Sequence, residues 1–128
     1  MGIMGGDIID DKDGKFDMST SDRIRQVRQT LGLTQTVFGK RIAISTSYLA
    51  GMELGTKKIN DRAVRLIAME YGVDEHWLRT GEGTMYNEQT DVAVIKITSL
   101  FKSLKPKYQE CALIQINALA DLDDSTEE

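Results

Sequence analysis

The sequence has very few of the residues that build disulfides and metal sites. Among 128 residues it holds one cysteine, Cys111, and one histidine, His76. A single cysteine cannot close a disulfide within the chain, and one histidine leaves no cluster with metal-ligand spacing. We therefore expect no disulfide framework, no metal and no cofactor. Cys111 lies close to an apolar stripe, which favours a buried thiol, and His76 follows two acids, which favours a solvated ring.

Long apolar runs are also missing. No stretch approaches the roughly 18 apolar residues that cross a bilayer. The N-terminus carries acidic residues where a secretory signal would be apolar. We expect a soluble, cytoplasmic protein with no membrane partner. Its length and its 41% hydrophobic content fit one compact domain with an added element.

The net charge of −4 hides an uneven distribution. Residues 18–86 hold ten Lys or Arg against seven Asp or Glu, whereas the segments before and after them are both acidic. A basic central module between acidic ends fits local attraction to phosphate. Charge by itself is a weak signal, because a solvated surface gives the same pattern.

The first 18 residues differ from the rest of the chain. They are rich in Gly and Asp and show no sustained hydrophobic period. We interpret residues 1–18 as a flexible acidic arm or as a remnant of an expression tag.

Residues 19–86 show helical hydrophobic spacing between capping residues, which predicts five short helices. With their caps, these helices are expected at Ser21 to Gly32, Thr34 to Ile42, Ser45 to Gly55, Asn60 or Asp61 to Gly72, and Asp74 to Gly81. The face of the first helix opposite its apolar residues carries Arg23, Arg25 and Arg28. The core is expected to include Phe38, Leu49, Val64, Ile67 and Leu78.

Residues 87–128 predict a helical hairpin followed by an acidic tail. One stripe comprises Val94, Ile97, Phe101 and Leu104, and the other comprises Tyr108, Ala112, Ile116 and Leu119. Pro106 suits the first position of the second helix. Because a lone hairpin cannot bury both stripes, we expect it either to dock on the preceding domain or to pair with a second copy.

The second and third helices are separated by only about three residues, Ala43 to Ser45. Such a connection forces a steep crossing and brings Gly39 close to the third helix, where a large side chain would not fit. The third helix can then enter a DNA major groove about 12 Å wide while the second lies across the backbone. This arrangement is a helix-turn-helix.

Several groups of residues resemble the lambda-repressor-like helix-turn-helix class of Cro and phage repressors. These are Leu33-Thr34-Gln35, Phe38-Gly39, Ile42-Ala43-Ile44-Ser45, Tyr48-Leu49, Glu53-Leu54-Gly55, Gly72-Val73-Asp74 and Trp77-Leu78 to Gly83. The resemblance covers about residues 21–84. It implies a five-helix DNA-binding domain, and with the helical hairpin expected in residues 87–128 the chain would be all-α. It also implies a sequence-specific, dimeric transcriptional repressor of phage or mobile-element type that binds double-stranded DNA.

The resemblance also implies which residues contact DNA. The set is Gln35, Lys40, Ser45, Thr46, Ser47, Tyr48, Ala50, Gly51, Lys57 and Lys58. Within it, Gln35 would bond a phosphate, the first turns of the third helix would face the bases, and Lys57 and Lys58, with Lys40 and Arg41, would contact phosphates. Hydroxyl groups at Thr46 and Ser47 can serve any base edge, so readout by water or by DNA shape is expected to contribute. Ala43 stands where the class commonly has glycine; if its φ is positive, alanine costs about 1 kcal/mol.

Two other functional classes are weighed against this one. An enzyme is not expected, because no nucleophile–base pair or phosphate-binding glycine loop is found. Glu53 is expected to form a structural ion pair, and Trp77 to pack on the fourth helix rather than on a base. The alternative that stays open is a protein-interaction module, an antitoxin or an antagonist of another regulator. Two-fold operators favour a homodimer built by the hairpin, with a protein antagonist as a further possible partner.

Overall fold

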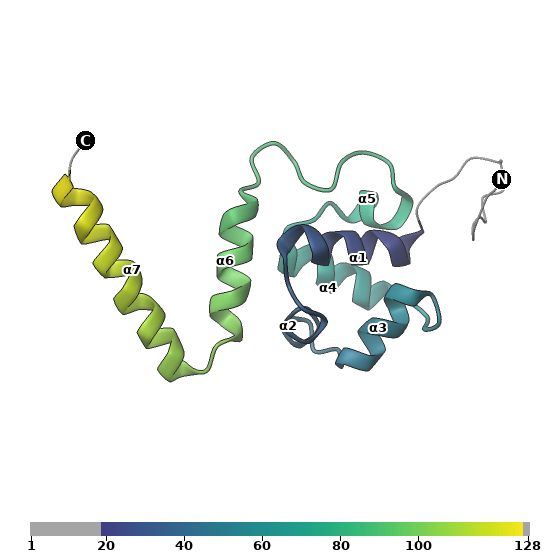
Figure 1. Cartoon of the computed structure of the whole chain (residues 1–128). Coiled ribbons are helices and arrows are strands. Elements are labelled where there is room, and N and C mark those ends of the chain that lie inside the picture. Colours follow the sequence, from purple (N-terminus) through teal and green to yellow (C-terminus); the bar gives the residue numbers. More distant parts are fainter. Residues whose placement is uncertain (1–18, 127–128) are drawn as a thin grey trace, which may run out of the picture.

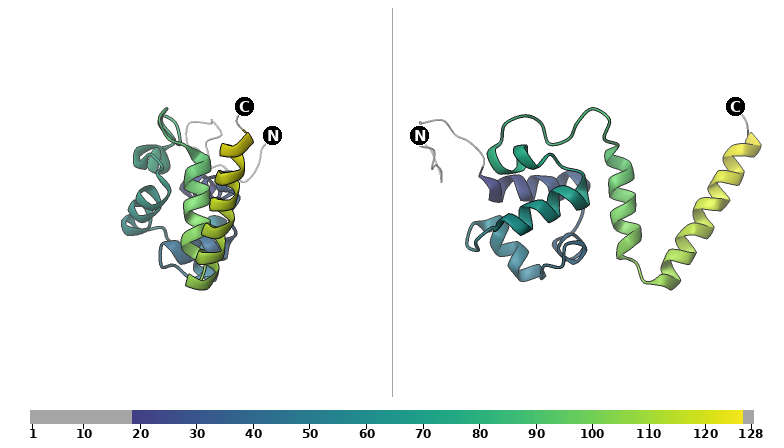
Figure 2. Two further views of the ribbon diagram at one scale, coloured as in Figure 1. Left: turned by 90° about the vertical axis from the view of Figure 1, so that its left-hand side faces the viewer. Right: turned by 180° about the vertical axis from the view of Figure 1, so that it is seen from behind.

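The computed structural model describes residues 19–126, and over this range the chain is all-helical (Figure 1). Its helices are α1 (Thr20–Leu31), α2 (Gln35–Arg41), α3 (Thr46–Leu54), α4 (Asp61–Tyr71), α5 (Glu75–Thr80), α6 (Val92–Ser103) and α7 (Pro106–Thr126). Helices α1 to α5 form a bundle, and α6 and α7 extend from it on one side (Figures 1 and 2). The acidic arm expected at residues 1–18 lies outside the described residues.

The helix boundaries follow from capping side chains. Thr34, Ser45, Asn60 and Asp74 each accept a backbone N–H at the start of the helix that follows them. The expected N-cap of α1 is wrong: the cap is Ser19, not Ser21. The Ser19 hydroxyl accepts from the Asp22 N–H at 3.1 Å, and the Asp22 carboxylate accepts from the Ser19 N–H at 3.3 Å. This reciprocal pair satisfies two free donors at once, which a cap at Ser21 would not do.

The core of the bundle is one cluster of apolar side chains from α1 to α5. The expected core residues Phe38, Leu49, Val64, Ile67 and Leu78 are all buried in it. The Phe38 and Tyr71 rings stack with centroids 4.3 Å apart, and the Tyr71 hydroxyl donates to the Phe38 carbonyl at 2.8 Å. Trp77 is buried in the same cluster, as expected. The cluster holds α2 and α3 rigidly against the other helices.

Helix α6 joins the bundle by a face that the hydrophobic pattern did not indicate. Val92 and Ile95 pack on the core cluster and Ser99 is buried, whereas Val94 and Ile97 of the expected stripe are exposed. Docking of the expected stripe on the preceding domain is therefore wrong, whereas its pairing with a second copy stays a prediction. Helix α6 is apolar on two sides, and the smaller side docks beside Gly72, where an added Cβ atom would lie 3.1 Å from Ile95 Cδ1.

The hairpin of α6 and α7 is open. The two helices join at Leu104 and Lys105 and then diverge (Figure 1). The expected burial of Cys111 is wrong, because α7 projects from the bundle and leaves the Cys111 thiol exposed. None of the helices between residues 19 and 126 combines the length and the apolar content that crossing a membrane requires.

The turn between α2 and α3 contains a strained residue. Ala43 has φ 59°, and it is the one non-glycine residue with positive φ among those the structure describes. We expect Ala43→Gly to raise the free energy of unfolding by about 0.5 to 1 kcal/mol, because glycine avoids the left-handed penalty but loses more chain entropy. Thermal unfolding of purified protein measures this. The same change at Ala50, inside α3, should instead destabilise by about 0.5 to 1 kcal/mol.

Candidate nucleic-acid interface

Helices α2 and α3 lie together on one side of the bundle (Figure 1). Their crossing depends on Gly39, whose carbonyl accepts from the N–H groups of Ile42 at 3.1 Å and Ile44 at 2.8 Å. A Cβ atom on Gly39 would lie 2.5 Å from the Ile44 oxygen. The expected close approach at Gly39 is confirmed, and it fixes the angle at which α3 leaves the turn.

The first turn of α3 presents hydroxyl groups to solvent. Thr46 and Ser47 are exposed, and Ser45 is the N-cap, accepting from the Tyr48 N–H at 3.1 Å. The hydroxyls of Thr36 on α2 and Thr46 on α3 lie 3.2 Å apart and share a hydrogen bond. The structure therefore brings these residues to one exposed end of the motif, where short donors and acceptors can meet base edges or bridging water.

In the second turn of α3, Gly51 does not lie on the surface that the resemblance implies for it. Gly51 is buried beneath Lys57, and its carbonyl accepts from the N–H groups of Thr56 at 2.9 Å and Lys57 at 3.1 Å. Glycine at this position lets the loop fold back over α3, since a Cβ would overlap the Lys57 side chain. Gly51 thus positions Lys57 instead of offering a surface of its own. Ala50 remains half-buried beside it.

Lys57 and Lys58 are held at the end of α3 by backbone contacts. The Tyr48 hydroxyl donates to the Lys58 carbonyl at 3.0 Å, which ties the loop to the first turn of α3. Both lysines are exposed, and no salt bridge involves either among the described residues. A fixed backbone with free ammonium groups suits phosphate contacts, which set position without reading sequence.

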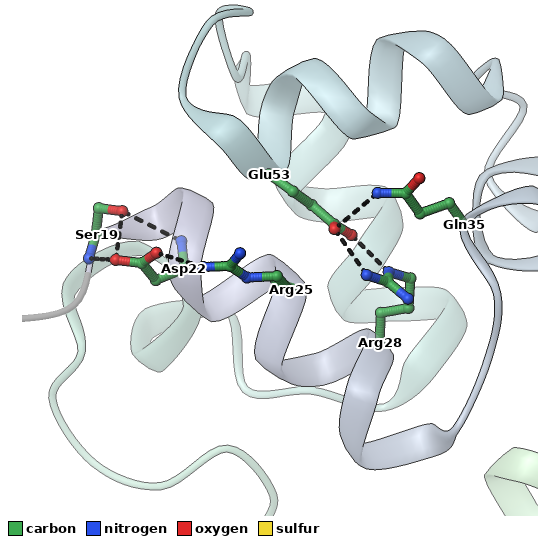
Figure 3. Close-up of polar contacts among 6 residues, drawn as sticks. All are labelled: Ser19, Asp22, Arg25, Arg28, Gln35 and Glu53. Carbon is green, nitrogen blue, oxygen red and sulfur yellow. Dashed lines mark hydrogen bonds and ion pairs between the residues drawn. The ribbon is translucent and has the colours of Figure 1, made fainter.

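Gln35, the expected phosphate ligand, belongs to a polar cluster between three helices (Figure 3). Its amide nitrogen donates to Glu53 Oε1 at 3.1 Å, while Arg28 donates to the same carboxylate through Nε at 2.7 Å and Nη2 at 2.9 Å. Arg28 also donates to the Leu33 carbonyl at 3.1 Å. Glu53 is therefore a structural ion-pair partner, as expected, and it fixes the orientation of the Gln35 side chain.

Hydrogen bonds and opposite charges in this cluster favour the ionised forms of both Glu53 and Arg28. Burial of Glu53 opposes its ionisation, but hydrogen bonds from Arg28 and Gln35 and the charge of Arg28 outweigh burial, so its pKa lies below its ordinary value. The hydrogen bond to Glu53 raises the pKa of Arg28. The two groups are charged together, and the pair ties α1 to α3.

Two arginines that were expected on the open face of α1 are in fact packed. Arg28 lies against Glu53, and Arg23 is buried, donating to the carbonyls of Leu78 at 2.9 Å and Arg79 at 3.0 Å. These carbonyls end α5, where a cation is favourable. Arg25 is half-buried and pairs with Asp22 at 3.2 Å. Charged residues at helical spacing do not reveal which of them a neighbouring helix will cover.

The remaining cations of the motif differ in their availability. Lys40 is exposed, whereas Arg41 pairs with Glu70 at 3.2 Å and so has part of its charge already neutralised. Arg62 and Arg65, which the sequence reading passed over, are exposed on α4 shortly after Lys58. Both lie on the face of α4 opposite the buried Ala63, Val64 and Ile67, so helical periodicity could have predicted their exposure.

Within residues 19–126, no group of three or more His, Cys, Asp or Glu side chains is placed to hold a metal ion. His76 is exposed and lies 2.9 Å from Glu82, also exposed, which fits the solvated position expected for it.

Comparisons with known proteins point to the same region. Residues 24–78 match the family described as helix-turn-helix. A propionyl-CoA carboxylase regulator from Cereibacter sphaeroides is 40% identical over 60 residues, which make up 47% of this chain and 13% of that protein. The chain thus corresponds to a small part of that regulator. No solved structure matches it significantly. Residues 24–78 are therefore similar to a helix-turn-helix domain, in agreement with the close crossing of α2 and α3.

Proposed function

We propose that this chain is a cytoplasmic, sequence-specific regulator of transcription that binds double-stranded DNA as a homodimer. The observation that carries the proposal is the exposed first turn of α3, held at a fixed angle by Gly39 and followed by the anchored Lys57 and Lys58. Base edges would meet Thr46 and Ser47, and phosphates would meet the lysines. The relative's name, which is that of a regulator, supports this direction.

The regulator acts as a repressor of phage or mobile-element type, by occupying DNA rather than by catalysis. A bound dimer needs no further chemistry to block access to a promoter. Its two α3 helices would read half-sites about 34 Å apart, one turn of duplex. The short hydroxyl side chains at the start of α3 give few bidentate contacts, so part of the specificity comes from bridging water and DNA shape.

The experiment that tests this function is selection of the purified protein against a random duplex pool, followed by sequencing of the bound fraction. An enriched two-fold motif supports the dimeric regulator and supplies its operator. If folded protein enriches nothing, the sequence-specific proposal fails. The protein-interaction alternative, an antitoxin or an antagonist of another regulator, then gains weight, since α7 carries many exposed apolar side chains.

The lysines after α3 should account for a measurable part of DNA affinity. Lys57→Ala combined with Lys58→Ala is expected to reduce the slope of log K against log salt by about 1.8, because each lost phosphate contact contributes about 0.9. Fluorescence anisotropy on the selected operator at several salt concentrations measures the slope. The matched control, Lys96→Ala with Lys102→Ala on α6, removes the same charge outside the motif and should leave the slope nearly unchanged. Equal changes in both variants would contradict a phosphate role for Lys57 and Lys58.

A further inference from the structure

Helix α7 has almost no partner within its own chain. Its 21 residues extend about 30 Å. Near its start Gln109 donates to the Phe101 carbonyl of α6 at 3.0 Å, and beyond that point α7 stands away from the bundle (Figure 2). Ile116 is 50% exposed and Leu119 64% exposed. A helix this long with an uncovered apolar stripe is marginal alone in water.

Helix α6, which meets α7 at Leu104 and Lys105, has an uncovered apolar face as well. Val94 and Ile97 lie on the side of α6 away from its docked residues, and both are exposed, as is Leu104 at the junction with α7. Figure 1 shows α6 between the bundle and α7. The uncovered surface is therefore shared by two helices, and together they expose more large apolar side chains than the rest of the described chain. An apolar surface of this kind marks an interaction site.

The charges at the two ends of α7 are placed against the helix dipole. Lys105 and Lys107 lie at its beginning, where the dipole favours anions, and Asp121 and Asp124 lie at its end, where the dipole favours cations. The first turn has no acidic residue and the last turn has no basic residue. Both ends of a lone α7 are thus electrostatically unfavourable.

We propose that α7 pairs antiparallel with α7 of a second copy of this chain. In that arrangement the basic start of each helix lies beside the acidic end of the other, and the two dipoles oppose each other. A parallel pair would instead place lysines beside lysines and aspartates beside aspartates. The proposal rests on the homodimer of the proposed function and specifies the surface and direction by which it forms.

The charges also set the register. Placing Lys105 level with Asp124 of the second helix puts the midpoint between residues 114 and 115. Cys111 then lies level with residue 118, whereas the two Cys111 residues are separated by about 10 Å along the axis. Cys111 and Ala118 are seven residues apart, so they lie on the same side of α7 and flank its apolar stripe. Disulfide cross-linking between Cys111 and a cysteine placed at position 118 can therefore test whether the two α7 helices run antiparallel.

The first test is oxidative cross-linking of three forms of the full chain. These are the unaltered protein with Cys111 only, the variant C111S/A118C with the second position only, and the variant A118C with both. We expect a covalent dimer from A118C and little from the other two. Efficient cross-linking of both single-cysteine proteins would overturn the antiparallel arrangement, because in its register each of these residues lies about 10 Å along the axis from its own copy.

The second test changes charge without removing apolar contacts. K105E/K107E makes both ends of α7 acidic and is expected to raise the dimer dissociation constant about tenfold at low salt, with a smaller effect at high salt. K105E/K107E/D121K/D124K reverses both ends, restores the net charge and should restore the dimer. Sedimentation equilibrium measures each constant, and circular dichroism confirms that the bundle is folded. An unchanged constant in K105E/K107E, or no recovery in the fourfold variant, would overturn the proposal.

Failure of this arrangement differs from failure of the proposed function. A monomeric unaltered protein overturns both the α7 pairing and the homodimer. A dimer whose cross-links follow the parallel pattern overturns the pairing direction but leaves the homodimer intact. DNA selection is read independently of either result, because it reports on α3 and its loop.

Discussion

Replacing Gly39 with valine is expected to cost at least about 3 kcal/mol of folding stability and to abolish DNA binding. The first carbon of any side chain here would lie 2.5 Å from the Ile44 carbonyl oxygen. That oxygen is backbone, so the clash cannot be relieved by a rotamer change, and the turn must move. Since small domains are stable by only a few kcal/mol, about 0.05 to 0.15 per residue, much of the population should unfold.

Chemical denaturation of Gly39→Val and of Lys40→Val separates this clash from the weak helix propensity of valine. Lys40 is the next residue on α2 and is exposed, so valine there should cost less than about 1 kcal/mol. Gly39→Ala should fall between the two, because it makes the same backbone contact but gains helix propensity. If Gly39→Val had a denaturation midpoint close to that of the unaltered protein, the rigid turn would be the wrong account of how α3 is oriented.

Local chemistry explains why most helix boundaries could be predicted. A cap such as Ser45 or Asp74 acts on the backbone three residues away, so its signal is contained in a short stretch of sequence. The close approach at Gly39 could also be predicted locally, from the short connection between the second and third helices. At the start of α1, Ser19 and Ser21 compete, and the reach of Asp22 back to Ser19 decides between them. The spacing of Ser19 and Asp22 is itself a local signal, and it outweighs the apolar period that favoured Ser21.

Contacts between distant segments could not be predicted in the same way. The burial of Arg23 depends on the end of α5 lying across α1, and the burial of Arg28 depends on Glu53 lying opposite it. Helical periodicity describes one helix at a time. For α6 it favoured the larger apolar face, whereas docking used Val92 and Ile95 on the other side. The face left uncovered is part of the surface that the α7 pairing would use.

The DNA-contact residues were inferred from the class, and the structure adds how they are supported. Gly51 lies under Lys57, and Tyr48 anchors the loop through the Lys58 carbonyl. Helical or strand periodicity predicts neither contact, because a loop that folds back on a helix brings together residues at irregular separations in the sequence. The set of contacts remains a prediction, and the salt-slope experiment on Lys57 and Lys58 tests its cationic part.

Glu53→Gln is expected to destabilise the bundle by about 2 to 4 kcal/mol, because it leaves the Arg28 guanidinium partly buried without an anion. The exposed fractions of the two side chains are 15% for Arg28 and 3% for Glu53, so solvent replaces little of the lost interaction. The substitution also loosens Gln35, which loses a charged acceptor. Binding to the selected operator should weaken under conditions where the variant is still folded.

A double-mutant cycle with Arg28→Met separates the ion pair from the shape of the site. Removing both charges should cost less than the sum of the single changes, because neither partner is left unpaired. Urea denaturation of the four proteins measures the coupling. Strictly additive losses would show that the Arg28–Glu53 contact contributes little in solution.

The pH dependence of stability gives an independent check on the same pair. The pKa of Glu53 lies below its ordinary value of 4.5 in the folded state, so the folded protein holds this proton less tightly than the unfolded chain does. The stabilisation is therefore fully present above that ordinary value and is lost as the pH falls through the lower, folded-state pKa. The stability difference between the unaltered protein and Glu53→Gln should shrink over this acidic range, while other carboxylates affect both proteins alike. A difference that stayed constant from neutral pH into this range would mean that Glu53 is not held as an anion by Arg28 and Gln35, and α3 would then owe its position to apolar packing and the Gly39 turn alone.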